Sequence, residues 1–340
     1  MKMPRLFVRR PKDEGGLALT RRQLLAAGSL GAAGLLTRGG RKASAFQHEQ
    51  HLRDHFGNTT VGEVDTKIFN PMTYLEEFDR GKESIQPDGT VLREFQITSV
   101  DVEIEVAPGV FFPAWAYNGK VPGPTLRANA GDRVRVNFTN AGRHPHTIHF
   151  HGFHSAGMDG VFELVKHNET FTYEFIADPF GLHLYHCHTP PLKRHIHKGL
   201  YGTFIVDPPG GRPPAREMVM MMNGFDTNLD GENEIYAVNS VAHYYMRHPI
   251  HVKQNELIRV YLVNITEFDL INSFHSHATF FNEFRTGTKL EPDNFTDTII
   301  LGQGERSILE FSYREPGSYM FHAHVSEFAE LGWAGMFEVT

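Results

Sequence analysis

Apolar and polar residues alternate in short runs along most of the chain from residue 91 onward. The clearest run is VLREFQITSVDVEIEVAPG at 91–109, and GDRVRVNFTN at 131–140 and FTYEFIAD at 171–178 repeat the pattern. Alternation with a period of two places successive side chains on opposite faces of a β-strand. These segments therefore predict strands that bury one face and expose the other.

Turn-forming residues separate the predicted strands. Asn118-Gly119 and Val121-Pro122-Gly123-Pro124 have the composition of tight turns, and the last strand of this unit, GTFIVDP, ends near residue 208. No segment shows a convincing helical period over a long stretch. Short strands joined by Gly/Pro turns predict an all-β fold, with a Greek-key β-sandwich over residues 91–208.

The second half of the chain weakly repeats the first. NELIRVYLVN at 255–264 is similar to GDRVRVNFTN, and YMFHAHVSEFAELGWAGMFEV at 319–339 is similar to the segment that ends the first sandwich. The Pro/Gly-rich residues 208–216 predict a linker, and MVMMMN at 218–223 predicts a methionine-rich core strand. A second sandwich over residues 215–340, in tandem with the first, accounts for the repeat.

The N-terminal segment has the composition of an export signal. TRRQLL at 20–25 resembles the twin-arginine signature, and ASA at 43–45 fits a cleavage site. The apolar stretch between them is short and glycine-rich for a membrane span. We therefore expect residues 1–45 to be a twin-arginine-type signal that directs the protein to the periplasm or the cell exterior. Residues 46–90, polar and without sustained periodicity, are expected to form an N-terminal extension.

Charge narrows the classes of partner. Residues 1–45 hold 10 Lys and Arg and 2 Asp and Glu, which leaves 23 basic and 38 acidic residues in 46–340, a net charge of −15. A strongly acidic chain is a poor partner for nucleic acid or an anionic membrane surface. The chain also contains 1 Cys and 21 His, so it has no internal disulfide and an unusual supply of imidazole.

The single cysteine stands between two histidines. His186, Cys187 and His188 are consecutive in the segment HLYHCH, and on a strand the two histidines face one way while the thiol faces the other. A cysteine with two histidines and a weak axial neighbour is the ligand set of blue copper. One strand can therefore contribute to two metal sites, one on each face.

Other histidines share these two faces. His149 and His151 have the parity of His186 and His188, whereas His146 has the parity of Cys187. His195, on the loop after the strand, can complete the set with Cys187 and His146. Leu200 would then occupy the axial position, where a methionine would be a weak ligand.

The second half keeps one face of this arrangement and loses the other. Its two His-x-His pairs, on corresponding strands, are His275 with His277 and His322 with His324. The positions that correspond to the thiolate set carry other residues, namely Ala323 for Cys187, Asn272 for His146, Phe328 for His195 and Trp333 for Leu200. Each half therefore offers four histidines, and only the first offers a thiolate.

With these motifs combined, residues 92–340 resemble the two-domain multicopper oxidases, which are built like the copper nitrite reductases and related to laccases. The resemblance implies two cupredoxin-like domains and four copper ions per chain. A type 1 copper would be bound by His146, Cys187 and His195. The eight paired histidines would bind a trinuclear type 2/type 3 cluster between domain 1 of one subunit and domain 2 of its neighbour in a homotrimer.

The chain departs from the resemblance at informative positions. The axial methionine of the family is Leu200 here, which is expected to raise the potential of a three-coordinate copper. Nitrite reductases have an Asp where this chain has His149, and a small residue at His188, so histidine at both positions favours dioxygen over nitrite. The spacing alone leaves His195 and His197 open as the loop ligand, and His195 fits the family better.

Two carboxylates are candidate proton donors to the cluster. Asp159, in GMDG after the HFHG segment, resembles the acidic residue that relays protons in this family, although an ordinary turn Asp is an equal reading. Glu327, three residues after His324, is a weaker candidate and could instead bond a ligand imidazole.

The resemblance implies an exported oxidase that takes single electrons from a phenol, an aromatic amine or a metal ion and reduces dioxygen to water. Two alternatives stay open. One is a copper nitrite reductase that forms nitric oxide, and the other is a periplasmic copper-binding or electron-transfer protein without enzymatic activity.

Overall fold

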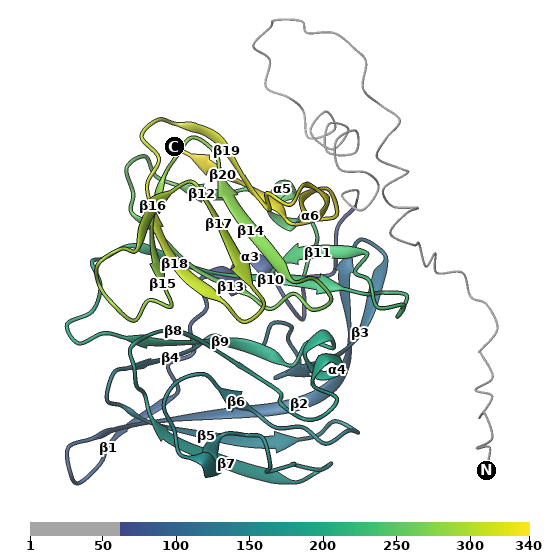
Figure 1. Ribbon diagram of the computed structural model, residues 1–340, viewed down its shortest axis with the longest axis vertical. Coiled ribbons are helices and arrows are strands. Elements are labelled where there is room, and N and C mark those ends of the chain that lie inside the picture. The colour runs from purple at the N-terminus through teal and green to yellow at the C-terminus, as the bar shows by residue number, and fades with distance from the viewer. Residues whose placement is uncertain (1–61) are drawn as a thin grey trace, which may run out of the picture.

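The computed structural model describes residues 62–340, and Figure 1 shows them as two β-sandwiches stacked one above the other. Strands β1 to β9 form the first sandwich and β10 to β20 form the second. The expectation of two tandem cupredoxin-like Greek-key sandwiches is confirmed. The signal expected in residues 1–45 lies outside the described residues.

The first sandwich consists of two sheets. One sheet contains β1 (Lys82–Ile85), β2 (Val91–Ala107), β3 (Val110–Tyr117), β5 (Arg133–Asn140) and β7 (Thr170–Ile176). The other contains β4 (Leu126–Asn129), β6 (His149–Phe150), β8 (Gly181–His186) and β9 (Tyr201–Asp207). The long strand β2 pairs with β1 and β5 along its first half and with β3 along its second half, so β3 reaches toward the second sandwich (Figure 1).

The second sandwich repeats this topology. One sheet contains β10 (Arg216–Phe225), β11 (Ile235–Val238), β13 (Ile258–Asn264), β15 (Phe281–Arg285), β16 (Asn294–Thr296) and β18 (Arg306–Phe311). The other contains β12 (Ile250–Val252), β14 (Ile271–Ser276), β17 (Thr298–Gly302), β19 (Gly317–His322) and β20 (Ala334–Val339). The parallel pair β10–β13 corresponds to β2–β5, and the order β12-β20-β19-β14 corresponds to β4-β9-β8-β6. The sequence repeat is therefore a repeat of strand order.

Strand β10 explains how the two sandwiches adhere. Met218, Met220 and Met222 pack into the core of the second sandwich, while Val219 and Met221 pack into a cluster shared with the first sandwich. All five side chains are fully buried. A strand buried on both faces has a continuous apolar sequence in place of an alternating one. The prediction of a methionine-rich core strand is confirmed.

Residues 62–81 pack against both sandwiches, and β1 after them belongs to the first one. The helix α3 (Pro71–Glu76) begins at Asn70, whose Oδ1 accepts the backbone N–H groups of Met72 and Thr73 at 2.9 and 3.2 Å. Tyr74 lies in the cluster between the sandwiches and Leu75 in the core of the second one. The described part of the expected extension therefore contributes to the core.

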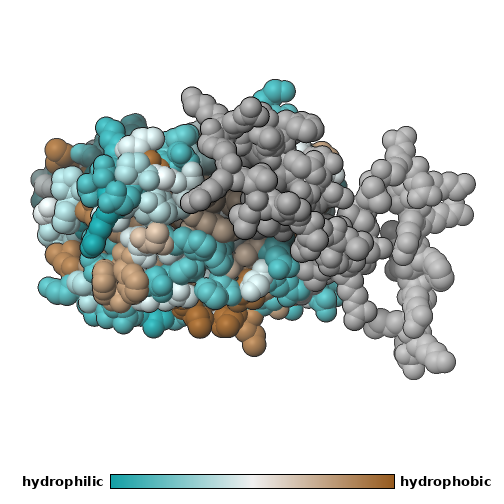
Figure 2. All heavy atoms as spheres, turned by 90° about the horizontal axis from the view of Figure 1, so that it is seen from above, coloured by the Kyte–Doolittle hydropathy of each residue, from teal (hydrophilic) through white to brown (hydrophobic). Residues whose placement is uncertain are grey.

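Helices are short throughout residues 62–340. Besides α3 they are the 3₁₀ turn η2 (Ala156–Met158), α4 (Leu192–His197), α5 (Tyr244–Arg247) and α6 (Ser326–Glu330). Within this range none has the length and apolar composition that a membrane crossing requires. Figure 2 shows a face that is mostly hydrophilic, with apolar side chains gathered in separate patches.

Candidate metal centre

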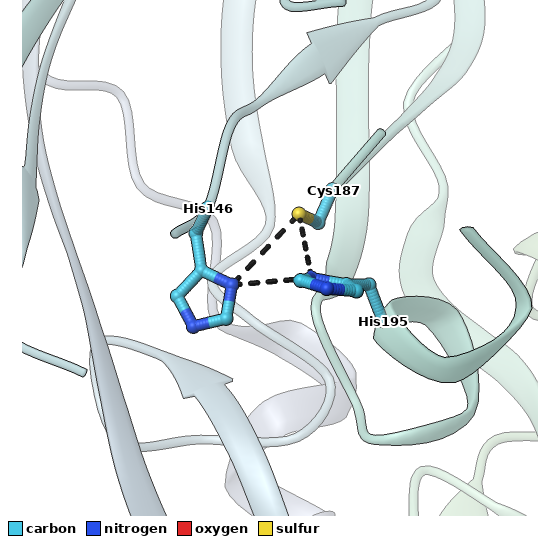
Figure 3. Close-up of side chains that lie close together, drawn as sticks. All are labelled: His146, Cys187 and His195. Carbon is cyan, nitrogen blue, oxygen red and sulfur yellow. Dashed lines mark hydrogen bonds between the residues drawn. The ribbon is translucent and has the colours of Figure 1, made fainter. Parts of the chain in front are cut away.

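Three side chains from different parts of the first sandwich meet around the single thiol (Figure 3). Cys187 follows β8 directly, His195 lies in α4, and His146 forms an isolated β-bridge with Val165. The Cys187 Sγ atom lies 3.2 Å from Nδ1 of His195 and 4.0 Å from Nδ1 of His146, and the two nitrogens are 3.2 Å apart. The structure therefore brings together the three residues that the sequence grouped.

The helix α4 decides which histidine faces the thiol. His195 points toward Cys187, whereas His197 turns to the opposite side, where its Nε2 accepts the backbone N–H of Asp226 at 3.3 Å. Its ring also contacts Phe112 and Phe268 at centroid distances of 5.3 and 4.8 Å. His197 thus belongs to the contact between the sandwiches, and the geometry selects His195 from the two residues that the spacing left open.

The cluster has the electrostatics of a soft-metal site. Burial lowers the pKa of His146 to about 3 and that of His195 to about 4, so both imidazoles are neutral and offer lone pairs at pH 7. Burial also raises the pKa of the Cys187 thiol, while the backbone N–H of Thr147, 3.4 Å from Sγ, favours the thiolate. A bound cation would stabilise the thiolate further. One thiolate and two neutral imidazoles in a buried pocket fit copper.

Leu200, the residue expected at the axial position, lies near the thiol. It is fully buried in the same apolar cluster as Cys187. Its carbonyl accepts the N–H of Cys187 at 2.9 Å, and its own N–H donates to the carbonyl of His195 at 3.3 Å. The backbone of Leu200 therefore ties together the two chain segments that carry the thiol and the α4 imidazole.

The other face of the same strands carries four histidines. His149 on β6 is the register partner of His186 on β8, and the ring of His149 lies 5.2 Å from those of His151 and His186 and 5.5 Å from that of His188. Nε2 of His151 and Nε2 of His186 are 3.3 Å apart. Burial lowers the pKa of His151 to about 2 and of His186 to about 4, so these imidazoles are neutral ligands.

The second sandwich presents an equivalent set. His275 on β14 is the register partner of His322 on β19, and its ring lies within 5.4 Å of the other three, which are His277, His322 and His324. Nδ1 of His322 bonds the carbonyl of Ala323 at 2.7 Å, and Nδ1 of His275 bonds that of Asp297 at 2.9 Å. With Nδ1 protonated and occupied, Nε2 is the atom left for a metal.

The second sandwich keeps the backbone of the thiolate site without its ligands. The N–H of Ala323 donates to the carbonyl of Trp333 at 3.1 Å, and the N–H of Trp333 donates to the carbonyl of Phe328 at 2.8 Å. These two bonds repeat the bonds that Leu200 forms with Cys187 and His195 in the first sandwich. The positions of Ala323, Phe328 and Trp333 therefore correspond in structure to those of Cys187, His195 and Leu200, with apolar side chains in place of the thiol and the α4 imidazole.

The two four-histidine sets do not meet within the chain. Among residues 62–340, no ring contact or hydrogen bond joins a histidine of one set to a histidine of the other. The set of the second sandwich borders an open hollow of about 650 Å³, in which His277 is exposed to solvent. Within the described residues the two sets are therefore separate groups of four histidines.

The two candidate carboxylates are placed differently. Asp159 follows η2, and its Oδ1 lies 3.1 Å from Nδ1 of His149, whose ring nitrogen also bonds the Asp159 carbonyl at 2.8 Å. His154 lies 3.8 Å from the same carboxylate. Glu327 lies in the first turn of α6, on the segment that follows His324. Asp159 thus has a direct contact with His149, one of the paired histidines.

Some residues of these sites carry no local signal in the sequence. The ring of Trp115 on β3 contacts those of His146 and His195 at centroid distances of 5.3 and 4.9 Å. Arg306 on β18 reaches from the second sandwich to within 3.4 Å of Nδ1 of His151. Both contacts join segments that lie far apart in the sequence, so neighbouring residues could not reveal them. For the contact of Trp115, the sequence offered one hint, which is that the chain contains only 2 Trp.

Comparisons with known proteins agree with this arrangement. The chain is 29% identical over 250 residues to a copper-containing nitrite reductase of Neisseria gonorrhoeae, covering 67% of this chain and 63% of the length of that relative. It is similar to a crystal structure of a multicopper oxidase, with a TM-score of 0.79, 55% identity and coverage of 80% of this chain and 97% of that one. It is also similar to a copper nitrite reductase from Nitrosomonas europaea, with a TM-score of 0.66, 26% identity and coverage of 73% and 94%.

Family models lead to the same group. Two models, both described as multicopper oxidase, match residues 85–211 and 211–340. They meet at the Pro/Gly-rich segment between the sandwiches, and each covers one four-histidine set. By sequence and by structure, the chain belongs to the multicopper oxidase family, whose members are copper-dependent oxidoreductases.

Proposed function

We propose that this protein is a laccase-like oxidase that couples the one-electron oxidation of a donor to the four-electron reduction of dioxygen to water. The observation that carries the proposal is the simultaneous presence of one buried Cys-His-His cluster and two complete four-histidine sets. A protein that only carried electrons would need the first and not the other two. The proposed donor is a phenol, an aromatic amine or a metal ion.

The proposed ligands form two kinds of copper site. His146, Cys187 and His195 would hold a type 1 copper, and the eight paired histidines would hold a trinuclear cluster. Copper at these sites supplies reversible one-electron storage and a binding site for dioxygen. Cys187 is peptide-bonded to His186 and His188, so the covalent route between the two sites is short. Asp159, bonded to His149, is placed to pass protons toward the second site.

The chain itself favours an oxidase over a nitrite reductase. Both His149 and His188, the positions where nitrite reductases are expected to differ, are present and point into the first four-histidine set. The multicopper oxidase structure is 55% identical to this chain, whereas the two nitrite reductases are 29% and 26% identical. The nitrite reductase reading therefore remains the second candidate.

Assembly and export complete the proposal. Since the two four-histidine sets lie apart within one chain, we place the cluster between the first sandwich of one subunit and the second sandwich of another, in a homotrimer. The nitrite reductase relatives share the two-domain architecture that such a ring requires. Export by a twin-arginine-type signal to the periplasm or cell exterior would suit a protein that takes up copper before leaving the cytoplasm.

Copper content and oxygen uptake test the proposal together. We expect four copper ions per chain in the loaded protein and oxygen uptake with a phenolic donor, with water and not hydrogen peroxide as the product. Two copper ions per chain with nitric oxide formed from nitrite would favour the reductase, and a single copper without turnover would favour the electron carrier. Metal analysis and an oxygen electrode distinguish these three results.

Leu200→Met is expected to lower the potential of the type 1 copper. A thioether in the axial position stabilises the oxidised ion more than the reduced ion, and methionine conserves the volume of the buried leucine. A redox titration followed at the blue absorption measures the change. Leu200→Ile is the matched control, because it alters the packing and adds no ligand. An equal shift in both variants would assign the effect to packing and remove Leu200 from the axial position.

A further inference from the structure

The helix α4 carries a group of unpaired cations beside the thiolate site. Lys193, Arg194 and Lys198 lie on or next to this helix, and among residues 62–340 none of them has a carboxylate within ion-pair distance. Each instead lies over an aromatic ring, Lys193 over Phe268 at 4.2 Å, Arg194 over Trp115 at 5.2 Å and Lys198 over Phe112 at 4.8 Å. The surface nearest the proposed type 1 copper is thus locally basic, although the chain as a whole is acidic.

A cleft of about 420 Å³ opens on one side of α4, and we name it the Trp115 cleft. Its lining includes Trp115, His144 and Arg194 together with other charged residues. The volume is within the range of small-molecule sites. On its floor, Trp115 contacts the ring of His144 at 4.7 Å on the outer side and those of His146 and His195 within. A molecule in the cleft would be separated from the thiolate site by a single ring.

Three cations and two carboxylates surround this cleft. The Arg143 side chain is 89% exposed, and its Nε lies 3.8 Å from Oδ2 of Asp101. This ion pair is long and solvated, so a ligand can displace it. Glu103 has no cation within ion-pair distance among the described residues. The three cations exceed the two carboxylates by one positive charge, and neither Arg194 nor Lys198 forms an ion pair with a described carboxylate, so the field in the cleft favours an anion.

A second cleft on the opposite side of α4 fits this role less well. Its volume is about 520 Å³, and it is lined by His197, Asp226 and Phe268 together with Lys193, Arg194 and Lys198. The imidazole that faces it is His197, which is bonded to Asp226 and turned away from Cys187. A ligand there would have the helix between itself and the thiolate site.

We propose that the Trp115 cleft is the docking site for the electron donor, and that it selects aromatic donors with an anionic substituent, such as phenols that carry a carboxylate. The ring of the donor would lie against the exposed His144, which packs on Trp115, and its anionic group would pair with Arg194. This inference rests on the proposed oxidase function and names the class of its donor. In the step itself, the donor loses one electron to the oxidised type 1 copper and its phenolic proton to solvent, and becomes a phenoxyl radical.

The reduction of the blue copper without oxygen tests this choice of donor. In an anaerobic stopped-flow instrument, the wild type is mixed with syringate or with its neutral methyl ester, and bleaching of the blue absorption gives the rate constant. For Arg194→Gln we expect the rate constant with syringate to fall on the order of fivefold, because one solvated charge pair is lost. The rate constant with the methyl ester should stay at its wild-type value.

Lys253→Gln is the matched control. Lys253 is exposed, has the same charge and lines neither cleft, so its removal should change neither rate constant. Added salt should slow the reaction of syringate with the wild type and with Lys253→Gln, and should have a smaller effect on Arg194→Gln. Equal rate changes for syringate and its ester, or none in Arg194→Gln, would overturn the donor site while leaving the oxidase intact. A preference for an acidic protein donor over syringate would likewise overturn it.

Binding to the copper-free protein gives a second readout that does not depend on turnover. The chain contains 2 Trp, and the other one, Trp333, is fully buried in the second sandwich. We expect 3,4,5-trimethoxybenzoate, which has no phenolic proton to lose, to quench the fluorescence of Trp115 at lower concentration than its methyl ester. The difference should disappear in Arg194→Gln, and the quenching itself in Trp115→Phe. Quenching that persists in Trp115→Phe would place the ligand elsewhere and refute the site.

Discussion

Replacing Cys187 with serine is expected to abolish the blue absorption and to lower oxidase activity by at least about 100-fold, because the only thiolate of the centre is removed. The structure gives the reason for so large an effect. Sγ of Cys187 lies within 4.0 Å of both imidazole nitrogens, and the chain has no second cysteine to replace it. Absorption spectra, metal analysis and oxygen uptake measure the three consequences.

The fold should survive this substitution. A hydroxyl is smaller than a thiol and can accept the N–H of Thr147 that now points at Sγ. Circular dichroism should therefore be unchanged, and the copper bound by the paired histidines should remain. Ala323→Ser, at the corresponding position of the second sandwich, is the matched control and should keep the blue colour. An intense blue band in Cys187→Ser would refute the assignment of the thiolate site.

The parity of residues along a strand was sufficient to predict the two faces of the site. His186 and His188 flank Cys187 on β8 and the residues just after it, and the strand geometry alone places the thiol opposite the imidazoles. The pairing of His149 with His186 then follows from two adjacent antiparallel strands. Both arrangements depend on residues that are close in the sequence or on adjacent strands, so they could be predicted from the sequence.

Contacts between distant segments were beyond the reach of pattern reasoning. Trp115 meets His146 and His195 only because β3 and α4 are brought to the same end of the sandwich, where the N–H of Trp115 donates to the carbonyl of Lys198 at 2.7 Å. The choice between His195 and His197 also depended on how α4 is oriented, which the spacing of residues does not determine. The sequence predicts that a thiolate and imidazoles form a metal site, and the packing decides which side chains lie next to one another in that site.

The segment before the first sandwich shows a further limit. Residues 62–81 have no clear period, because they bury single side chains such as Tyr74 and Leu75 in different clusters. An element that wedges between two domains needs no continuous apolar face. Its short helix is recognisable only from the cap at Asn70 followed by Pro71.

Mixing two inactive variants should restore activity if the cluster lies between subunits. His151→Ala damages the set of the first sandwich and His324→Ala that of the second. In a ring where each first sandwich meets the second sandwich of a neighbour, random exchange of equal amounts leaves about one quarter of the interfaces with both sets intact. We therefore expect recovery of about a quarter of wild-type activity, measured as oxygen uptake after subunit exchange.

Apolar side chains around both sets support this contact. Phe153 and Phe162, on the loop after His151, are 67% and 82% exposed, and Phe280 and Phe295 beside the second set are 52% and 70% exposed with their rings 5.4 Å apart. Exposed aromatic groups at the edge of an incomplete site are typical of a surface that another subunit covers. Sedimentation of the copper-loaded protein should accordingly give three times the mass of the chain.

The control for the mixing experiment combines two variants with damage in the same sandwich. His151→Ala mixed with His188→Ala should stay inactive, because every first sandwich then carries a defect and no interface can be complete. Recovery in this control would mean that exchange or metal uptake, and not complementation, restores activity. In a ring of three, a contact between the first sandwich of a His324→Ala chain and the second sandwich of a His151→Ala chain contains four intact histidines from each side. Such contacts form whenever labelled subunits exchange. If the mixture of His151→Ala with His324→Ala exchanges subunits and still stays inactive, the eight histidines must come together within one chain.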